Sequence, residues 1–219
     1  KQVSINTNKD LSKLLGINQS VAITCVKPSG TVSQLVDSSS GIHARHNPYY
    51  IRTIRADKKD PLAKMMKDAG FPYEPDVTKP EHTLVFSFPV KGPKNGVYRK
   101  DMSAIEQLEL WKIYQDNWCE HKPSVTVSVQ ENEWMNVGSW VWEHFDQMSG
   151  VSFLPMTEHS YRQAPYQDCS ASEYMELMKK MPKEYDWVQL SQYEETDMTI
   201  GSQELACSAD GCEIVDLVI

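Results

Sequence analysis

Short β-rich runs alternate with amphipathic helical segments along most of this 219-residue chain, and this alternation constrains its fold more than any other feature. The residue pattern predicts strands at 21–26, 49–54, 83–88, 124–129 and 151–154. It predicts helices at 8–15, 61–69, 103–117, 134–145 and 170–178. Because strands that alternate with helices are typical of α/β proteins, we expect an α/β fold with a largely parallel sheet.

The clearest local signals are those that start and stop helices. Asp60 followed by Pro61 is a typical helix start, and Gly70 is placed to end the same helix. Ser103 and Glu106 have the spacing of a capping box at the start of the longest predicted helix. Within that helix we expect the apolar side chains, Ile113 included, to face inward.

The charge balance is acidic, with 30 Asp and Glu against 22 Lys and Arg and a formal net charge of −8. This argues against direct nucleic-acid binding, because duplex affinity comes mainly from a basic surface that neutralises phosphates. A small pocket for one nucleotide remains compatible with the acidic background. No apolar run approaches the roughly 20 residues that a membrane helix needs, so no membrane association is expected.

The five cysteines do not form the even, closely spaced set of a secreted disulfide scaffold. Cys25, Cys119 and Cys169 stand alone, and only Cys207 and Cys212 are close together. We therefore expect a reducing, cytoplasmic location.

A run of small and hydroxylated residues, Pro-Ser-Gly-Thr-Val-Ser at 28–33, directly follows the first predicted strand. Small residues let backbone N–H groups approach an oxyanion, and hydroxyls add further donors, so the run is a candidate phosphate-binding loop. It lacks the Gly-Lys-[Ser/Thr] ending of a Walker loop. From these residues alone, an ordinary strand-to-helix turn is an equally good interpretation.

Several longer segments carry a family resemblance. They lie at 24–33, 39–45, 49–52, 117–127 and 161–166, and include Ser-Ser-Gly-Ile-His-Ala-Arg and Asn-Trp-Cys-Glu-His-Lys-Pro-Ser-Val-Thr-Val. Together they resemble ribonucleotide reductases, above all the adenosylcobalamin-dependent (class II) ribonucleoside-triphosphate reductases. The resemblance covers most of the chain, and several blocks are long enough to be specific.

The resemblance implies a fold and a division of the chain. Residues 1–182 would be the carboxy-terminal portion of a ten-stranded reductase-type α/β barrel, and residues 183–219 a flexible tail that carries a redox cysteine pair. Because the chain begins at Lys1 and its first residues read as the middle of a sequence, we expect it to be a part of a longer protein.

The resemblance also assigns a phosphate site. In this family the barrel strand that leads into the loop presents Ser and Thr to the substrate's phosphates. Carried over position by position, the implied residues are Ser29, Gly30, Thr31, Val32 and Ser33. The substrate would be a ribonucleoside triphosphate, reduced to the deoxyribonucleotide.

The family's radical chemistry uses a cysteine in an Asn-x-Cys-x-Glu loop, and that pattern is absent from this sequence. The resemblance therefore implies that the radical cysteine and most of the adenosylcobalamin site lie outside this chain. The chain alone should be inactive and should need the upstream remainder of the reductase as a partner. The alternatives are a nucleotide-phosphate-binding module without redox activity, or an orphaned fragment.

Cys207 and Cys212 are separated by four residues that include Gly211, so their sulfurs could reach disulfide distance. The residues alone leave open an incidental pair of thiols or, less plausibly, half of a zinc site. The resemblance implies a shuttle that re-reduces the active-site disulfide and is itself reduced by thioredoxin.

Other polar residues near the loop receive more modest interpretations. Arg45 or Arg52 could support the phosphate end of a ligand, while His43 and His46 are expected to be hydrogen-bonding loop residues. We expect Cys25 to be buried in a strand and unreactive. A packing role is predicted for Trp134, Trp140 and Trp142.

Overall fold

The computed structural model describes residues 1–156 and 162–194, and it divides the chain into two compact units. Unit 1 comprises residues 1–53 and 88–177, and unit 2 comprises residues 54–87 and 178–219. Both units contain helices and strands, so the expected α/β class is confirmed. The predicted boundary between a barrel part and a tail at residue 182 stays a prediction.

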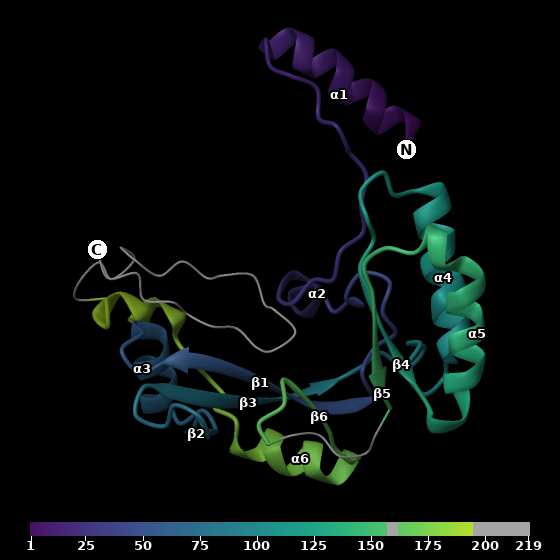
Figure 1. Ribbon diagram of the computed structural model, residues 1–219. Helices are drawn as coiled ribbons and strands as arrows, with labels where there is room; N and C mark the ends of the chain where they lie inside the picture. Colours follow the sequence, from purple (N-terminus) through teal and green to yellow (C-terminus); the bar gives the residue numbers. More distant parts are fainter. Residues whose placement is uncertain (157–161, 195–219) are drawn as a thin grey trace. The chain divides into compact units, whose positions relative to one another are not determined.

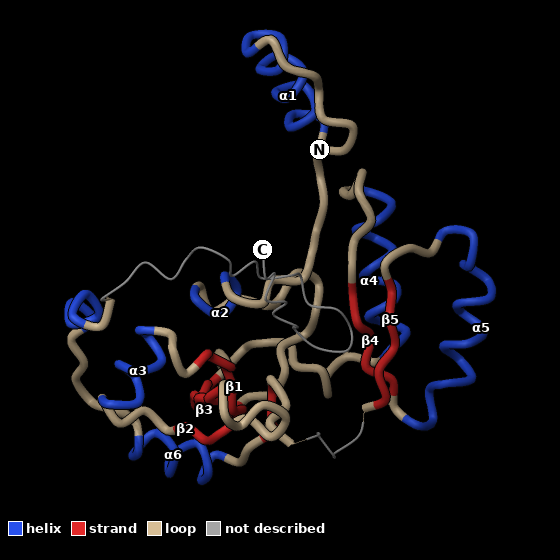
Figure 2. The backbone as a smooth tube through the Cα atoms, turned by 60° about the vertical axis from the view of Figure 1, so that its left-hand side comes forward, coloured by secondary structure: helices blue, strands red, loops and turns tan. Residues whose placement is uncertain are grey.

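A parallel strand pair covered by two helices forms the core of unit 1. Strands β4 (Val125–Val129) and β5 (Val151–Pro155) pair in parallel from Val125↔Val151 onward. Helices α4 (Ala104–Asn117) and α5 (Trp134–His144) lie beside this pair (Figures 1 and 2). Alternation buries every second residue of β4. The buried cluster consists of Ile42, Ala104, Leu108, Trp111, Val125, Val127, Val129, Val137 and Trp140.

Helix α4 begins as its sequence predicts. The Ser103 hydroxyl accepts a hydrogen bond from the Glu106 N–H at 3.2 Å, and the Glu106 carboxylate accepts one from the Ser103 N–H at 2.8 Å. Leu108 and Trp111, three residues apart, share the buried face. The expectation that Ile113 also faces inward is wrong: two positions beyond Trp111, it lies on the far side of the helix and is exposed.

A second, four-stranded sheet has the order β2-β3-β1-β6. Its strands are β1 (Tyr49–Asp57), β2 (Tyr73–Pro75), β3 (Thr83–Lys91) and β6 (Tyr166–Asp168). Pairs β1–β6 and β2–β3 are antiparallel, so the expectation of a largely parallel sheet is wrong. The short connection 76–82 brings the chain straight back from β2 into β3, which is possible only for antiparallel neighbours.

Helix α3 (Pro61–Asp68) of unit 2 has the predicted start and stop. The Asp60 carboxylate accepts a hydrogen bond from the Leu62 N–H at 2.8 Å, and Gly70 follows with a φ of 82°. Beyond the helix, Phe71 contacts the rings of Tyr185 and Trp187. These rings give unit 2 an aromatic cluster next to the 3₁₀ turn η3 (Trp187–Gln192).

The predicted strand at 21–26 is not a strand. Its backbone bonds to an irregular loop: the Thr24 carbonyl accepts hydrogen bonds from the N–H groups of Glu120 and His121 at 2.9 and 3.2 Å. A β-rich run forms a strand only beside a partner strand, and this loop does not provide one. Cys25 is accordingly half-buried in a loop rather than in a strand.

The remaining helices are α1 (Gln2–Leu15), α2 (Val32–Leu35) and α6 (Ala171–Lys180), and two 3₁₀ turns, η1 (Glu131–Glu133) and η2 (Phe145–Gln147), flank α5. Helix α1 is longer than predicted but ends at Gly16 as expected. The packing role holds for Trp140, whereas Trp134 and Trp142 are exposed. No helix in the described part of the chain is both long and apolar enough to cross a membrane.

Candidate functional site

The predicted phosphate loop, residues 28–33, is folded by its own serines. The Ser29 hydroxyl oxygen accepts a hydrogen bond from the Ser33 N–H at 3.0 Å, and the Ser33 hydroxyl donates to the Ser29 carbonyl at 2.7 Å. Ser33 is buried, so its hydroxyl closes the turn before α2 instead of facing solvent. The Ser33 hydroxyl, one of the predicted phosphate donors, therefore holds the loop in shape.

The backbone N–H groups of Gly30, Thr31 and Val32 are the donors that stay available. All three residues are exposed, and within residues 1–156 and 162–194 no acceptor bonds to these N–H groups. Successive unpaired N–H groups in a turn make a concave site that suits an oxyanion. The structure therefore places at the loop surface the chemistry that phosphate binding needs.

A second segment, residues 38–43, packs against the loop and holds it by hydrogen bonds. The Ser40 hydroxyl accepts a hydrogen bond from the Ser29 N–H at 2.8 Å and donates one to the Ser29 carbonyl at 2.9 Å. Gly41 has a φ of 60°, and a Cβ there would lie 2.8 Å from the Lys27 carbonyl oxygen. The close approach of the two segments thus requires glycine at this position.

A cavity of about 670 Å³ opens within unit 1. Of the loop residues 28–33 only Pro28 lines it, so the predicted phosphate-binding residues 29–33 lie outside its lining. Pro28, Gln34 and Ser40 line it from the loop side, while Ser128 and Leu154 line it from the carboxyl-terminal halves of β4 and β5. Ligands of open α/β sheets bind at the carboxyl ends of parallel strands. The cavity has a volume typical of sites for small organic ligands.

Two arginines reach the cavity, each already paired with an aspartate. Arg45 donates from Nη1 to the Asp37 carbonyl at 2.8 Å and also bonds to the Asp37 carboxylate. Arg99 Nη2 lies 2.7 Å from both carboxylate oxygens of Asp168. Arg45, one of two arginines expected to support the phosphate end, therefore lines the cavity and also fixes Asp37, two residues beyond the end of α2.

His46 contributes an uncharged wall to the same cavity. Burial, and next the positive charge of Arg99, lowers the pKa of His46 to about 4, although Asp168 opposes the shift. Its Nε2 lies 2.7 Å from an Asp168 oxygen, as a close contact rather than an aligned hydrogen bond. The ring also contacts Tyr50 and Tyr166. His46 is thus neutral at physiological pH.

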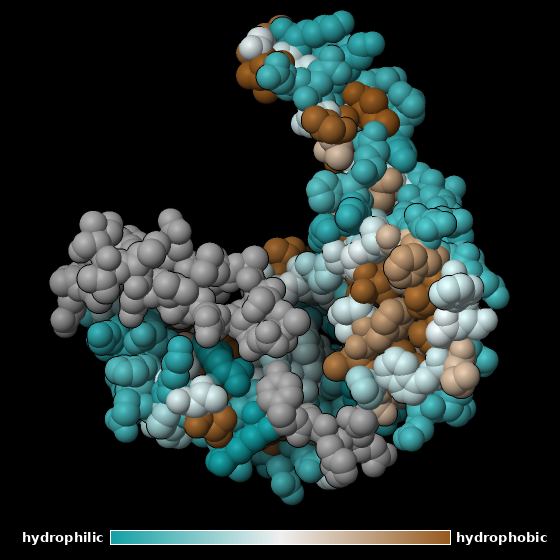
Figure 3. All heavy atoms as spheres, viewed as in Figure 1, coloured by the Kyte–Doolittle hydropathy of each residue, from teal (hydrophilic) through white to brown (hydrophobic). Residues whose placement is uncertain are grey.

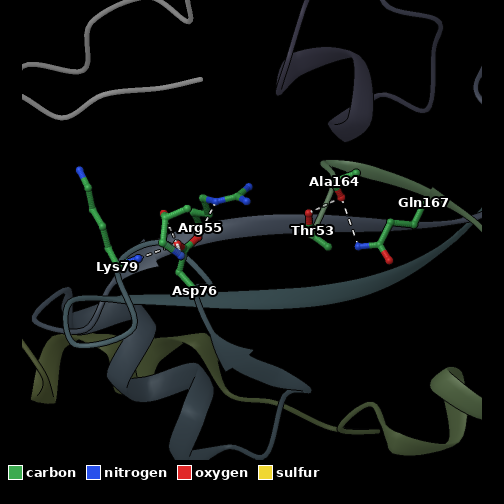
Figure 4. Close-up of polar contacts among 7 residues, drawn as sticks. Thr53, Arg55, Asp76, Lys79, Ala164 and Gln167 are labelled. Atoms are coloured by element: carbon green, nitrogen blue, oxygen red, sulfur yellow. Dashed lines mark hydrogen bonds and ion pairs between the residues drawn. The ribbon is translucent and has the colours of Figure 1, made fainter. Parts of the chain in front are cut away.

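The other predicted arginine, Arg52, supports the cavity wall from outside it. Its guanidinium lies 4.3 Å from the centre of the Tyr166 ring, and Nη1 donates to the Pro165 carbonyl at 3.1 Å. The Thr53 hydroxyl bonds to the Ala164 carbonyl at 2.8 Å, and the Gln167 amide bonds to the same oxygen at 3.2 Å (Figure 4). These contacts fix the wall segment 164–166.

Two of the isolated cysteines, Cys119 and Cys169, are poorly suited to redox chemistry. Burial raises the pKa of Cys119, and burial followed by the charge of Glu173 raises that of Cys169. Their thiols therefore stay protonated at neutral pH. The predicted redox pair, Cys207 and Cys212, lies outside the described residues.

Sequence reasoning missed several cavity residues, among them Gln34, Ser40, Arg99 and Tyr166. The three consecutive serines at 38–40 were a usable signal, because a run of small hydroxylated residues before a glycine suits a close-packed turn. No sequence signal pointed to Arg99. Its neighbour Tyr98 forms an isolated β-bridge with Arg45, which is distant in sequence, and this bridge brings Arg99 to the cavity.

Comparison with known proteins identifies relatives that match most of the chain. No family model matches the chain. The adenosylcobalamin-dependent ribonucleoside-triphosphate reductase of Euglena gracilis is 30% identical over 205 residues, which are 92% of this chain and 28% of that protein. The enzymes of the same name from Lactobacillus gasseri and Lactobacillus leichmannii are each 32% identical, over 79% and 78% of this chain and 24% and 23% of their own lengths.

A solved structure agrees with these relatives. The crystal structure of a B12-dependent (class II) ribonucleotide reductase matches with a TM-score of 0.69 and 28% identity, over 89% of this chain and 27% of that one. The chain thus spans about a quarter of the length of the relatives it matches. The chain is homologous to the carboxy-terminal part of the adenosylcobalamin-dependent ribonucleoside-triphosphate reductases.

Proposed function

We propose that this chain is the carboxy-terminal segment of a vitamin-B12-dependent reductase that converts ribonucleoside triphosphates to deoxyribonucleoside triphosphates by thiyl-radical chemistry. In this proposal, residues 29–33 bind the substrate's phosphates and the adjoining cavity receives the rest of the nucleotide. The observation that carries the proposal is the set of three exposed N–H groups at Gly30, Thr31 and Val32, which have no acceptor among the described residues. The cavity is lined by Pro28 and Gln34, which stand on either side of these residues in the sequence, and it has a volume typical of small-ligand sites.

The charge of the site suits a bound phosphate chain. Arg45 and Arg99 line the cavity, and their aspartate partners hold both guanidinium groups in place before a ligand arrives. Pre-paired arginines also prevent a strongly positive pocket that would bind any anion. Specificity would then come from the fixed direction of the loop N–H groups.

The family's cofactor, adenosylcobalamin, does not fit this cavity. A corrin ring with its adenosyl and nucleotide arms is much larger than the ligands that a cavity of about 670 Å³ encloses. Within the described residues, no group of three or more His, Cys, Asp and Glu side chains could hold a metal ion. We therefore place the cofactor mainly on the remainder of the reductase and assign no step of its chemistry to the residues described above.

An apolar surface on α5 supports the need for such a remainder. Met135 and Trp142 are each 85% exposed, and Phe145 just beyond the helix is 70% exposed. Figure 3 shows apolar side chains gathered on this face of the molecule. Large apolar groups clustered on a surface mark contacts with another protein part. We propose that the upstream remainder of the reductase covers them.

We propose that Cys207 and Cys212 form the shuttle that carries electrons from thioredoxin to the active site. Each transfer would break one disulfide and form another, so that two thiols of the reductant end as a disulfide and the active-site pair ends as two thiols. The raised pKa values of Cys119 and Cys169 leave these thiols poor competitors for that role.

Reconstitution tests the proposal. The 219-residue chain would be combined with the upstream remainder, adenosylcobalamin, a ribonucleoside triphosphate and a small dithiol, and deoxynucleotide would be measured by chromatography. We expect product from the mixture and none from either part alone. No product from a mixture in which the two parts form a stable complex would contradict the proposal.

A cysteine variant tests the shuttle separately. With Cys207 and Cys212 both changed to Ser, turnover with thioredoxin should disappear, while turnover with a small dithiol that reaches the site directly should persist. Equal loss with both reductants would contradict the shuttle. Nucleotide binding without any redox phenotype would favour a phosphate-binding module instead.

A further inference from the structure

We propose that His43 is a positioning residue that ties the phosphate loop to strand β4 and thereby fixes the direction of the loop's unpaired N–H groups. The inference builds on the proposed function, because the loop matters only if residues 29–33 bind phosphates. His43 is the third residue of the segment Gly-Ile-His-Ala-Arg at 41–45, and the family resemblance gives this histidine no role.

Both ring nitrogens of His43 are engaged, one on each side of the link. The Thr126 N–H of β4 donates to His43 Nε2 at 2.9 Å. On the other side, His43 Nδ1 lies 2.7 Å from the Ser40 carbonyl oxygen. The imidazole thus spans the gap between a core strand and the segment that supports the loop.

The partners dictate which nitrogen carries the proton. A backbone N–H can only donate, so Nε2 must accept, and a carbonyl oxygen can only accept, so Nδ1 must carry the hydrogen. His43 therefore acts as a neutral ring with one donor and one acceptor in fixed directions. A phenylalanine of similar size would fill the space but make neither bond.

The link continues from Ser40 to the loop itself. The Ser40 hydroxyl holds both the N–H and the carbonyl of Ser29, and the Ser29 hydroxyl in turn holds the Ser33 N–H. The chain of bonds therefore runs from Thr126 through His43, Ser40 and Ser29 to Ser33. The available N–H groups at 30–32 lie between its last two members.

The supporting segment is also anchored in the core, which gives the link a rigid base. Ile42 is buried in the main apolar cluster, and the Gln107 side chain donates to the Ile42 carbonyl at 2.8 Å. His43 comes next in sequence and lies half-buried along the cavity. With both nitrogens occupied by protein partners, His43 has no free polar atom to offer a ligand. Its role is positioning and not catalysis.

Amide hydrogen exchange in the 219-residue chain tests the link without any ligand. His43→Phe should raise exchange at the Ser29 and Ser33 N–H groups by about tenfold, the loss expected for one hydrogen bond. His43→Gln, whose amide offers one donor and one acceptor, should keep exchange within about threefold of the parent chain. The Thr53 N–H, which bonds to the Pro165 carbonyl at 3.1 Å, is the internal control and should not change.

A second variant shows whether the bonds act in series. Ser40→Ala removes the hydroxyl that holds Ser29, so adding His43→Phe to it should raise Ser33 exchange by much less than tenfold. If the rises in Ser33 exchange caused by His43→Phe and by Ser40→Ala multiplied fully in the double variant, His43 would act on the loop by another route and the proposal would be overturned. Unchanged Ser29 and Ser33 exchange in His43→Phe, or an equal rise at Thr53, would also overturn it.

Binding of inorganic tripolyphosphate, measured by calorimetry, separates this inference from the proposed function. The parent chain and His43→Gln should bind alike, and His43→Phe should bind about tenfold more weakly. Failure of the parent chain to bind tripolyphosphate would count against the phosphate site. The exchange result would still decide whether His43 holds the loop.

Discussion

The phosphate loop of unit 1 and the turn at Asp76 in unit 2 are both irregular segments held by side-chain hydrogen bonds, yet they differ in what they leave free. Asp76 accepts hydrogen bonds from the Thr78 N–H at 2.8 Å, the Thr78 hydroxyl at 2.5 Å and the Lys79 N–H at 3.0 Å. Arg55 Nε adds a fourth at 2.8 Å (Figure 4). In the phosphate loop, by contrast, three consecutive N–H groups remain without an acceptor among the described residues.

The difference separates a structural turn from a proposed binding turn. The Asp76 carboxylate accepts four hydrogen bonds from Thr78, Lys79 and Arg55, so it serves to hold its own turn. In the proposed phosphate loop, neutral hydroxyls hold the shape, and we propose that the backbone donors at residues 30–32 serve an external acceptor.

The largest expected effect is on the stability of the Asp76 turn. Asp76→Ala leaves Arg55 and two backbone N–H groups without their common acceptor, so the free energy of unfolding should fall by about 3 kcal/mol. Chemical denaturation would measure the loss, and tripolyphosphate affinity should stay unchanged. A loss below about 1 kcal/mol would show that the turn is not held by its carboxylate.

Acid titration should separate the two units because their buried groups respond in different pH windows. In the folded state the pKa of His46 is lowered to about 4, so as the pH falls the unfolded state takes up a proton before the folded state does. The free energy of unfolding should therefore fall by up to about 3 kcal/mol between pH 6.5 and 4. Burial would raise the pKa of Asp76, but hydrogen bonds from Thr78, Lys79 and Arg55 outweigh it and hold the pKa well below its usual range. Its contribution is therefore present above about pH 4 and is lost below it.

His46→Gln is the matched control for this titration. It should flatten the dependence of unfolding free energy on pH between 6.5 and 4 while leaving the steeper loss below pH 4 in place. Thermal unfolding followed at half-unit pH steps would measure both windows. An unchanged slope between pH 6.5 and 4 would contradict the assignment of that window to His46.

A smaller effect is expected where the loop is held by hydroxyls. Ser33→Ala removes the hydrogen bond to the Ser29 carbonyl and should weaken tripolyphosphate binding by about tenfold, with a stability loss of about 1 kcal/mol. Calorimetry and denaturation would measure the two quantities on the same variant. A stability loss as large as that of Asp76→Ala would remove the distinction between the two turns.

The smallest effect on the free energy of unfolding is expected at Gly30, whose N–H is one of the donors of the proposed phosphate loop. An added Cβ there meets no atom within 4 Å, so Gly30→Ala should change the free energy of unfolding by less than about 0.5 kcal/mol. Any fall in tripolyphosphate affinity then reports the approach of a phosphate to this backbone. Gly41→Ala is the contrasting variant, because its Cβ would press on the Lys27 carbonyl and destabilise the fold itself.

The sequence predicted the elements whose signals are local. Asp60 and Gly70 set the limits of α3, and Ser103 with Glu106 started α4, because caps act within a few residues of where they stand. The failures required distant information. The run 21–26 had the composition of a strand but lies against a loop, and neither its composition nor its length could reveal that neighbour.

The candidate site divides in the same way. The small and hydroxylated residues of the loop were visible in the sequence, but the commitment of the Ser33 hydroxyl to Ser29 was not. Nor could spacing show that Arg99 would join Arg45 along the cavity, since their meeting depends on a bridge between distant segments. Residue types indicated the chemistry, and only the fold could show which donors remain free.

The bonds that fix the cavity wall also have a consequence for the order in which the protein can fold. Thr53 reaches Ala164 across 111 residues, and His43 reaches Thr126 across 83. Contacts of such separation are slow to form, because the intervening chain must first be brought together. During synthesis, the proposed phosphate loop emerges before β4, so the His43–Thr126 bond that supports it can form only later. The parallel β4–β5 pair and its two helices lie within residues 104–155, so their contacts span shorter sequence separations, and we expect them to form before the loop is arranged.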